Sequence, residues 1–164
     1  VMISDVDEIP DLSQIKNLDN YKYTAFKQKN LFYKFNLINK TIPDWYGTKI
    51  CKKKYLKNPQ WLRNQKVKKF SIFKFYKIKW NIIEDGGWHF SYLMEPKKIQ
   101  EKLKAFAHSE YNSEFYTDIT RIEKVINNKQ DLFERKQEYE IIDIDNSYPS
   151  FILSNKDKLL NWIA

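Results

Sequence analysis

The chain begins with a short apolar run that stops at a group of acidic residues. Val1, Met2 and Ile3 have the character of the end of a buried strand, and Pro10 prevents that strand from continuing. The residues between them include Ser4, Asp5, Asp7 and Glu8. Carboxylates just after a strand lie where α/β sheets bind ligands, and their oxygens suit Mg²⁺ or Mn²⁺. We therefore expect an α/β fold with a metal–phosphate site in this loop.

The same loop has a purely structural interpretation, in which Asp7 or Glu8 caps a following helix. Its position directly after an apolar strand favours the metal site.

The rest of the chain mixes expected strands and helices. Alternating or dense β-branched and aromatic residues favour strands at residues 26–37, 48–56, 70–83, 88–93 and 139–144. Helical spacing favours helices at residues 11–18, 59–65, 96–106, 116–128, 149–153 and 156–163. Glycines 86 and 87 mark the clearest turn. No repeat or linker is present, so we expect a single domain over residues 1–164.

Composition narrows the functional classes. The formal net charge is +8, but only three of the 29 basic residues are arginine, the preferred residue for bidentate phosphate and base contacts. This favours a lysine-rich solvated surface over a specific nucleic-acid site. One cysteine excludes an intrachain disulfide and a cysteine-based zinc site. No apolar run approaches the roughly 20 residues that span a bilayer, and P-loop, dinucleotide-binding and nucleophile-elbow motifs are absent.

Two further segments carry candidate functional residues. Trp88 and His89 follow the glycine turn, where they would offer a stacking surface and a metal or phosphate contact. His108 and Glu110 stand among aromatic residues at an expected helix end, where either could act as a general base. Their structural alternatives are a hairpin with a core tryptophan and a helix end with a histidine near the helix dipole.

Three segments together resemble glycosyltransferase family 17. They are Ser-Asp-Val-Asp-Glu-Ile-Pro at residues 4–10, Gly-Trp-His-Phe-Ser-Tyr at residues 87–92, and Lys-Ala-Phe-Ala-His-Ser-Glu-Tyr at residues 104–111. The resemblance continues through Asp-Leu-Phe at residues 131–133. The best-known members are β-1,4-mannosyl-glycoprotein 4-β-N-acetylglucosaminyltransferases, which add the bisecting N-acetylglucosamine of N-glycans. The pairing of the first two segments is specific, whereas neither is specific alone.

The resemblance implies a GT-A type of fold, a mixed sheet flanked by helices with the Asp-x-Asp motif at the end of a central strand. Such a fold needs nucleotide-binding strands before this motif. We therefore expect the chain to be the C-terminal part of a longer catalytic domain and to lack transferase activity by itself. The compartment stays open: the cytoplasm would suit a microbial or viral member, and the Golgi lumen a eukaryotic one.

The resemblance also implies roles for individual residues. Asp5 and Asp7 would hold Mn²⁺ or Mg²⁺ on the diphosphate of a UDP-sugar, with N-acetylglucosamine as the expected sugar and a glycan or glycoconjugate as acceptor. Glu8 would orient Asp7 or contact the donor. Trp88 and His89 would contact the substrate, and His89 could complete the metal shell.

The base that takes the proton of the acceptor hydroxyl is not fixed by the motifs. Asp85 and Glu110 are the candidates, and His108 is a candidate substrate contact.

Two rival interpretations remain. In a haloacid-dehalogenase-like phosphatase, Asp5 would be the nucleophile and Asp7 the acid, but the second metal motif of such enzymes is not evident. A basic, non-catalytic binding module would instead bind nucleic acid in a salt-dependent way without needing either aspartate.

Overall fold

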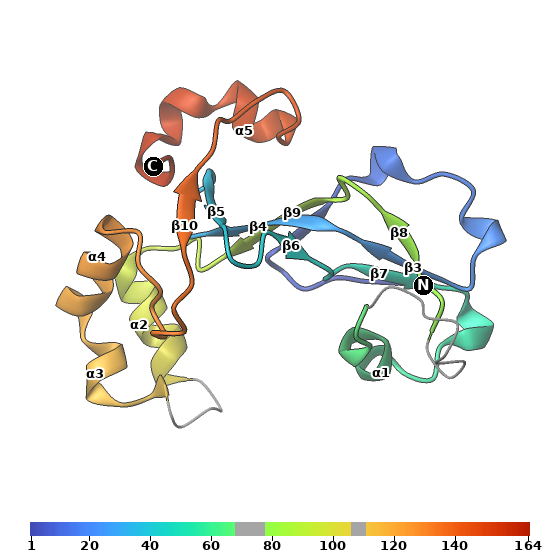
Figure 1. Cartoon of the computed structure of the whole chain (residues 1–164), viewed down its shortest axis with the longest axis horizontal. Coiled ribbons are helices and arrows are strands. Elements are labelled where there is room, and N and C mark those ends of the chain that lie inside the picture. Colours follow the sequence, from blue (N-terminus) through green and yellow to red (C-terminus); the bar gives the residue numbers. More distant parts are fainter. Residues whose placement is uncertain (68–77, 106–110) are drawn as a thin grey trace. The chain divides into compact units, whose positions relative to one another are not determined.

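The chain divides into two compact units of mixed strands and helices (Figure 1). The computed structural model describes residues 1–67, 78–105 and 111–164. The first unit comprises Val1–Asn30 and Asp44–His89, and the second comprises Leu31–Pro43 and Phe90–Ala164. Strands β4 (Gln28–Phe32) and β9 (Gly87–Ser91) contribute residues to both. The predicted α/β class is confirmed, and the single domain over residues 1–164 stays a prediction.

The first unit contains a four-stranded mixed sheet with the order β1-β7-β3-β8. Its strands are β1 (Met2–Ile3), β3 (Tyr23–Phe26), β7 (Lys49–Cys51) and β8 (Asn81–Ile83). Strand β3 pairs with β7 antiparallel and with β8 parallel. Ala25, Phe26 and Leu62 are fully buried, so the core of this unit lies against β3 and helix α1 (Pro59–Asn64). Helix α1 begins where the Asn58 side chain accepts a hydrogen bond from the Trp61 N–H at 2.7 Å.

A second set of paired strands in this unit joins distant parts of the sequence. Strand β2 (Glu8–Pro10) pairs with β9 antiparallel, and Glu8 stands opposite His89. Strand β6 (Asp44–Trp45) pairs with β4, and Trp45 stands opposite Gln28. Gly87 has a φ of 121°, and a Cβ there would lie 2.2 Å from a backbone oxygen of β2. Only glycine therefore allows the two strands to approach at this end.

The second unit packs helices over a short antiparallel sheet. Strand β5 (Leu37–Asn39) pairs with β4 and with β10 (Tyr139–Ile141). The helices are α2 (Pro96–Lys104), α3 (Glu114–Thr117), α4 (Ile119–Asn127) and α5 (Ser150–Ser154). Apolar residues at helical spacing pack inward from α2 and α4, because Ile99, Leu103, Ile122 and Val125 all belong to one core cluster. Ile119, at the start of α4, is instead 37% exposed.

The single strand predicted over residues 26–37 is wrong. The structure places β4 and β5 there as antiparallel neighbours, with Leu31 opposite Ile38. The reversal includes Tyr33, whose φ is 60° although it is not glycine. Its buried hydroxyl donates to the carbonyl of Gln130 and accepts from the N–H of Leu132, each at 3.2 Å. These tertiary contacts stabilise the left-handed backbone at Tyr33, which the alternating sequence pattern does not predict.

Several predicted boundaries also change. Residues 11–18 do not form an α-helix; instead, 3₁₀ turns occur at Leu12–Gln14 and Leu18–Asn20, since the Asp11 side chain binds the N–H of Ser13 in a local turn. Strand β7 ends at Cys51 and is followed by a 3₁₀ turn. The helix expected over residues 116–128 is divided at Asp118, which caps α4. Strand β1 is also not buried, as Met2 is 46% exposed.

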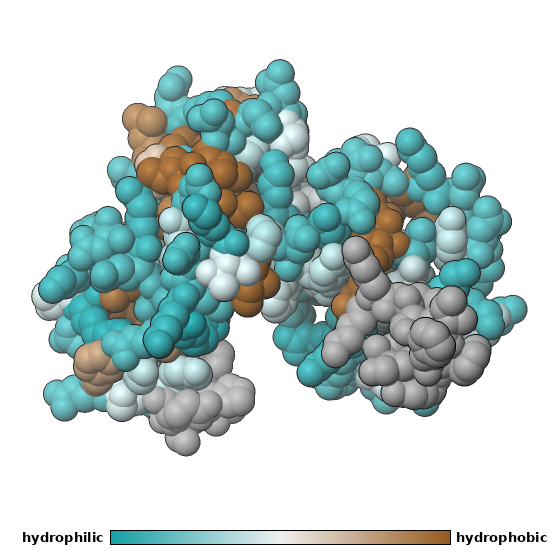
Figure 2. Space-filling view, in the orientation of Figure 1, coloured by the Kyte–Doolittle hydropathy of each residue, from teal (hydrophilic) through white to brown (hydrophobic). Residues whose placement is uncertain are grey.

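The predicted turn before β9 is confirmed, with Asp85 at a φ of 48°. Most of the strand expected at residues 70–83 lies outside the described residues. The visible face in Figure 2 is largely hydrophilic, with apolar residues gathered near α5. Exposed apolar side chains in that part of the chain include Ile141, Phe151 and Leu160. No helix within residues 1–67, 78–105 or 111–164 is long and apolar enough to cross a membrane.

Candidate active site

Glu8 is the buried centre of the acidic loop. Glu8 is only 6% exposed. One carboxylate oxygen accepts from the indole N–H of Trp45 at 2.9 Å, and the other accepts from the backbone N–H of Asp5 at 2.9 Å. The hydroxyls of Ser4 and Thr48 lie 3.4 Å from the second oxygen. Several donors therefore compensate for burial of this charge, and Glu8 ties the loop to the segment around residues 45–48.

Gly47 makes this arrangement possible. A Cβ at position 47 would lie 2.0 Å from Oε1 of Glu8 and 2.4 Å from Nε1 of Trp45. Any side chain there would occupy the space of the hydrogen bond between these two residues.

Trp45 connects the buried glutamate to His89. The rings of Trp45 and His89 stack with centroids 4.3 Å apart and planes 11° apart. The indole is 38% exposed, whereas His89 is 6% exposed. One aromatic side chain therefore contacts both sequence motifs, the acidic loop through a hydrogen bond and the histidine through stacking.

The two ring nitrogens of His89 have different partners. Nδ1 lies 2.9 Å from Oδ1 of Asn30. Because an amide oxygen only accepts, Nδ1 of His89 is the donor in this contact. Nε2 lies 3.6 Å from Oδ2 of Asp7. The structure thus brings together Asp7 and His89, two of the three predicted metal ligands.

Asp5, the third predicted ligand, is engaged in an ion pair. Its Oδ2 lies 2.6 Å from the Nη2 atom of Arg63 and 3.1 Å from Nε. The hydrogen bond and charge of Asp5 raise the pKa of the Arg63 guanidinium above its ordinary value. Arg63 lies in the last turn of α1, far from the acidic loop in sequence.

A cavity of about 300 Å³ adjoins this ion pair. Its lining includes Asp5, Glu8, Trp45, Lys49 and Arg63. Burial lowers the pKa of Lys49, and the charges of Glu8 and Asp5 partly oppose that effect. The Nζ atom of Lys49 donates to the backbone oxygen of Arg63 at 2.7 Å. The cavity therefore combines two cations, two carboxylates and an aromatic ring.

Trp88 and Asp85 do not join this group. Successive residues of a strand point to opposite faces, so Trp88 lies on the face of β9 opposite to His89. It is 8% exposed. Asp85 is exposed and precedes β9. It lies beyond the end of the β2–β9 pair at which Gly87 stands opposite Pro10. Asp7 adjoins the other end, where His89 stands opposite Glu8. His108 and Glu110 lie outside the described residues.

The donor set can be compared with what a divalent cation requires. No group of three His, Cys, Asp or Glu side chains in the described ranges is arranged to hold a metal ion. Mg²⁺, however, often binds through one or two carboxylates together with substrate phosphates and water. Histidines that bind metals usually donate from the other ring nitrogen, as His89 does toward Asn30. Asp7 and His89 therefore fit such an ion, whereas the Oδ2 atom of Asp5 is bound by Arg63.

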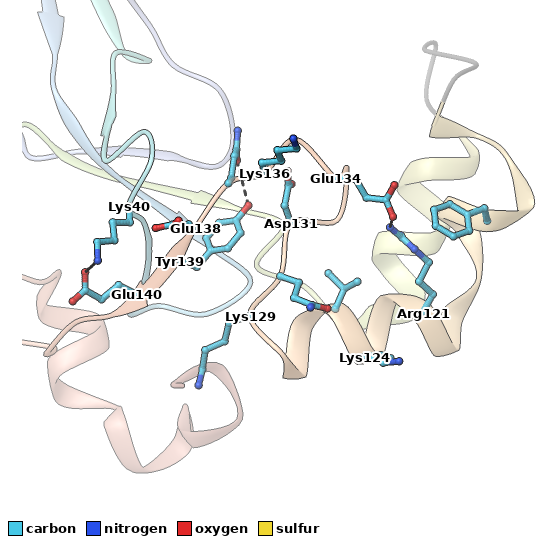
Figure 3. Close-up of a pocket in the computed structure, with 14 residues that line it drawn as sticks. Lys40, Arg121, Lys124, Lys129, Asp131, Glu134, Lys136, Glu138, Tyr139 and Glu140 are labelled. Atoms are coloured by element: carbon cyan, nitrogen blue, oxygen red, sulfur yellow. Dashed lines mark hydrogen bonds and ion pairs between the residues drawn. The ribbon is translucent and has the colours of Figure 1, made fainter.

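The second unit contains a larger and more open hollow of about 930 Å³ (Figure 3). Many charged residues around it are paired, including Lys40 with Glu140 at 3.8 Å and Arg121 with Glu134 at 3.4 Å. Asp131, which belongs to the last segment of the predicted resemblance, is 9% exposed and bound by Arg135. We expect these pairs to stabilise the local structure.

Sequence reasoning missed four of the residues that complete the site. Trp45, Asn30, Thr48 and Arg63 lie outside both motifs and reach them only through tertiary contacts. Two weak signals were available. Arg63 is one of only three arginines. Trp45 lies two residues before Gly47, the one glycine of three that is outside the turn at residues 86 and 87.

The comparisons with known proteins agree with the two motifs. The model of the family described as Glycosyltransferase family 17 matches residues 1–146. No curated protein and no solved structure gives a significant match. The match favours a transferase over a phosphatase or a basic binding module, and this family implies a sugar donor and a glycan acceptor. Because the matched region covers most of its length, the chain belongs to glycosyltransferase family 17.

Proposed function

We propose that this family member is a metal-dependent glycosyltransferase that moves N-acetylglucosamine from a UDP-sugar to a hydroxyl of a glycan. One observation carries the proposal. The two family motifs, some 80 residues apart in the sequence, are paired as neighbouring strands β2 and β9. This pairing places Nε2 of His89 3.6 Å from Oδ2 of Asp7.

The proposed chemistry is direct displacement at the anomeric carbon of the sugar. A bound Mn²⁺ or Mg²⁺ would stabilise the charge that develops on the leaving diphosphate. Asp5, Asp7 and His89 would hold the ion. Asn30 would fix the orientation of the His89 ring by accepting from Nδ1. Trp45 and Glu8 would keep the ring and the loop in place.

The proton of the acceptor hydroxyl must pass to a base. Asp85 and Glu110 remain the proposed candidates, on sequence grounds alone. Since Asp85 is exposed and lies beyond the opposite end of the paired strands from Asp7, we favour Glu110 for the first substitution.

Calorimetry of the whole chain with UDP tests the donor and the metal. We expect UDP to bind through its diphosphate in the presence of Mn²⁺ and to bind roughly tenfold more weakly to the Asp7→Asn variant, because the charge that holds the cation is lost. Asp157→Asn, an exposed aspartate in the second unit, is the matched control. If neither removing Mn²⁺ nor the Asp7→Asn substitution changes the affinity for UDP, the proposal is contradicted.

The identity of the sugar needs a separate comparison. We expect UDP-N-acetylglucosamine to bind more tightly than UDP-glucose or UDP-galactose under the same conditions. Equal affinity for all three would leave no support for N-acetylglucosamine. Salt-dependent nucleic-acid binding that survives Asp5→Ala and Asp7→Ala would instead support the basic binding module.

A further inference from the structure

The ion pair between Asp5 and Arg63 occupies one of the carboxylates that we propose as metal ligands. Both contacts from the guanidinium go to the same oxygen, Oδ2 of Asp5. A cation at this position neutralises the carboxylate and competes with any metal ion for it. The pair therefore bears directly on how the acidic loop accepts a divalent cation.

The exposure of the pair indicates that it can be exchanged. The side chain of Arg63 is 51% exposed and that of Asp5 is 33% exposed. Ion pairs with this much solvent contact are weak, because water competes for both charges. A divalent ion carries twice the charge of a guanidinium and can displace it from the carboxylate oxygen.

The local structure holds the base of Arg63 while leaving its end open. Lys49 donates to the backbone oxygen of Arg63, which anchors the end of α1 beside the acidic loop. The guanidinium lines the cavity of about 300 Å³ that also contains Lys49 and Trp45. A side chain released from Asp5 would thus remain beside the site with space to turn. Its planar set of donors matches two oxygens of a phosphate group.

We propose that Arg63 changes partners during donor binding: it pairs with Asp5 when no cation is bound, and it binds the donor diphosphate once the cation takes Asp5. This role rests on the proposed function. It makes Arg63 both a competitor of the metal and a ligand of the nucleotide, so its removal should change the two affinities in opposite directions.

Arg63→Gln tests this pair of effects in the whole chain. Without nucleotide, we expect Mn²⁺ to bind more tightly to the variant, by up to about fivefold, which is the scale of a weak ion pair. With saturating Mn²⁺, we expect UDP to bind roughly tenfold more weakly, because a charge-assisted contact is lost. Electron paramagnetic resonance of free Mn²⁺ measures the first affinity and calorimetry the second. Neither measurement requires catalytic activity.

Two further variants complete the design. Lys16→Gln removes the same charge from an exposed site and should leave both affinities unchanged. Arg63→Lys keeps the charge without the planar fork, so its UDP affinity should lie between those of the wild type and Arg63→Gln.

The outcomes separate this inference from the proposed function. If the wild type binds Mn²⁺ and UDP but Arg63→Gln behaves like Lys16→Gln, the exchange of partners is wrong and the proposed function stands. A fall in both affinities would also overturn the exchange, since it would mean that Arg63 only supports the loop. If the wild type binds neither ligand, both the exchange and the proposed function fail.

Discussion

Glu8→Gln offers the sharpest test of how the first unit holds the acidic loop. The carboxylate is buried, with each oxygen accepting one strong hydrogen bond, from the indole of Trp45 and from the N–H of Asp5. A glutamine side chain has nearly the same shape but only one accepting oxygen. Its amide nitrogen must therefore face one of these two donors.

The expected cost follows from these contacts. A hydrogen bond to a charged group contributes about 1.5–3 kcal/mol, and a buried donor left without an acceptor costs about 1–3 kcal/mol. The two effects overlap, since the loop can relax around the new amide. We therefore expect Glu8→Gln to lower the free energy of unfolding by about 2–4 kcal/mol.

Urea unfolding measures this change as a shift of the midpoint at constant slope. Amide hydrogen exchange in β2 and β9 provides a local measurement in the same unit. The control is Glu84→Gln, which removes a carboxylate that is 64% exposed and pairs with Lys27 at 2.6 Å. Because that ion pair is exposed to water, its loss should cost less than about 1 kcal/mol.

The losses of stability in Glu8→Gln and Glu84→Gln must be compared to decide whether Glu8 holds the loop. If Glu8→Gln costs no more than Glu84→Gln, the buried hydrogen bonds do not hold the loop, and our description of Glu8 as its structural centre is refuted. Unchanged hydrogen exchange in β2 and β9 would lead to the same conclusion.

Three further predictions address other parts of the chain. Gly47→Ala should cost about 2–4 kcal/mol in urea unfolding, because its Cβ would lie 2.0 Å from the Glu8 carboxylate; a stability equal to wild type would show that this contact is not needed. Tyr33→Phe should cost about 1–2 kcal/mol in the same assay, because a buried hydroxyl with two backbone partners is lost, and a neutral result would contradict this account of the β4–β5 reversal. Burial lowers the pKa of Lys49 in the folded chain. At pH values between that lowered pKa and the pKa of an unperturbed lysine, about 10.4, the unfolded chain binds more protons than the folded one. In this range Lys49 therefore makes the free energy of unfolding increase with pH. Lys49→Met should flatten that increase in urea midpoints measured from about pH 8 to 10, and an identical pH profile would argue against the shift.

Local patterns in the sequence predicted α2 and most of α4 because their buried faces repeat regularly. Ile99 and Leu103 lie one turn apart on α2, and both are fully buried. The helix expected over residues 156–163 is wrong, since 3₁₀ turns occur at Lys156–Lys158 and Leu160–Trp162. The same type of reasoning failed at residues 26–37, where the alternation of apolar residues continues through a chain reversal. The left-handed backbone of Tyr33 is held by groups about 100 residues further along the chain, so no local signal marks it.

The sequence predicted only those residues of the candidate site that lie within the two motifs. The sequence identified Asp7 and His89, and the structure places them together. It did not identify Trp45 or Arg63, because each meets the acidic loop through the fold alone. Trp88, adjacent to His89 in the motif, faces the other side of the strand, a distinction that requires knowledge of which face the site occupies.

The acidic loop places three carboxylates within four residues, and the fold treats each of them differently. Their mutual repulsion would destabilise a folded loop unless other groups compensate. Glu8 is buried and surrounded by hydrogen-bond donors, whereas Asp5 is half-exposed and balanced by an arginine that can leave. Asp7 faces the Nε2 atom of His89. The glutamate of the motif therefore supports the loop, and the two aspartates carry the charge that we propose for the cation.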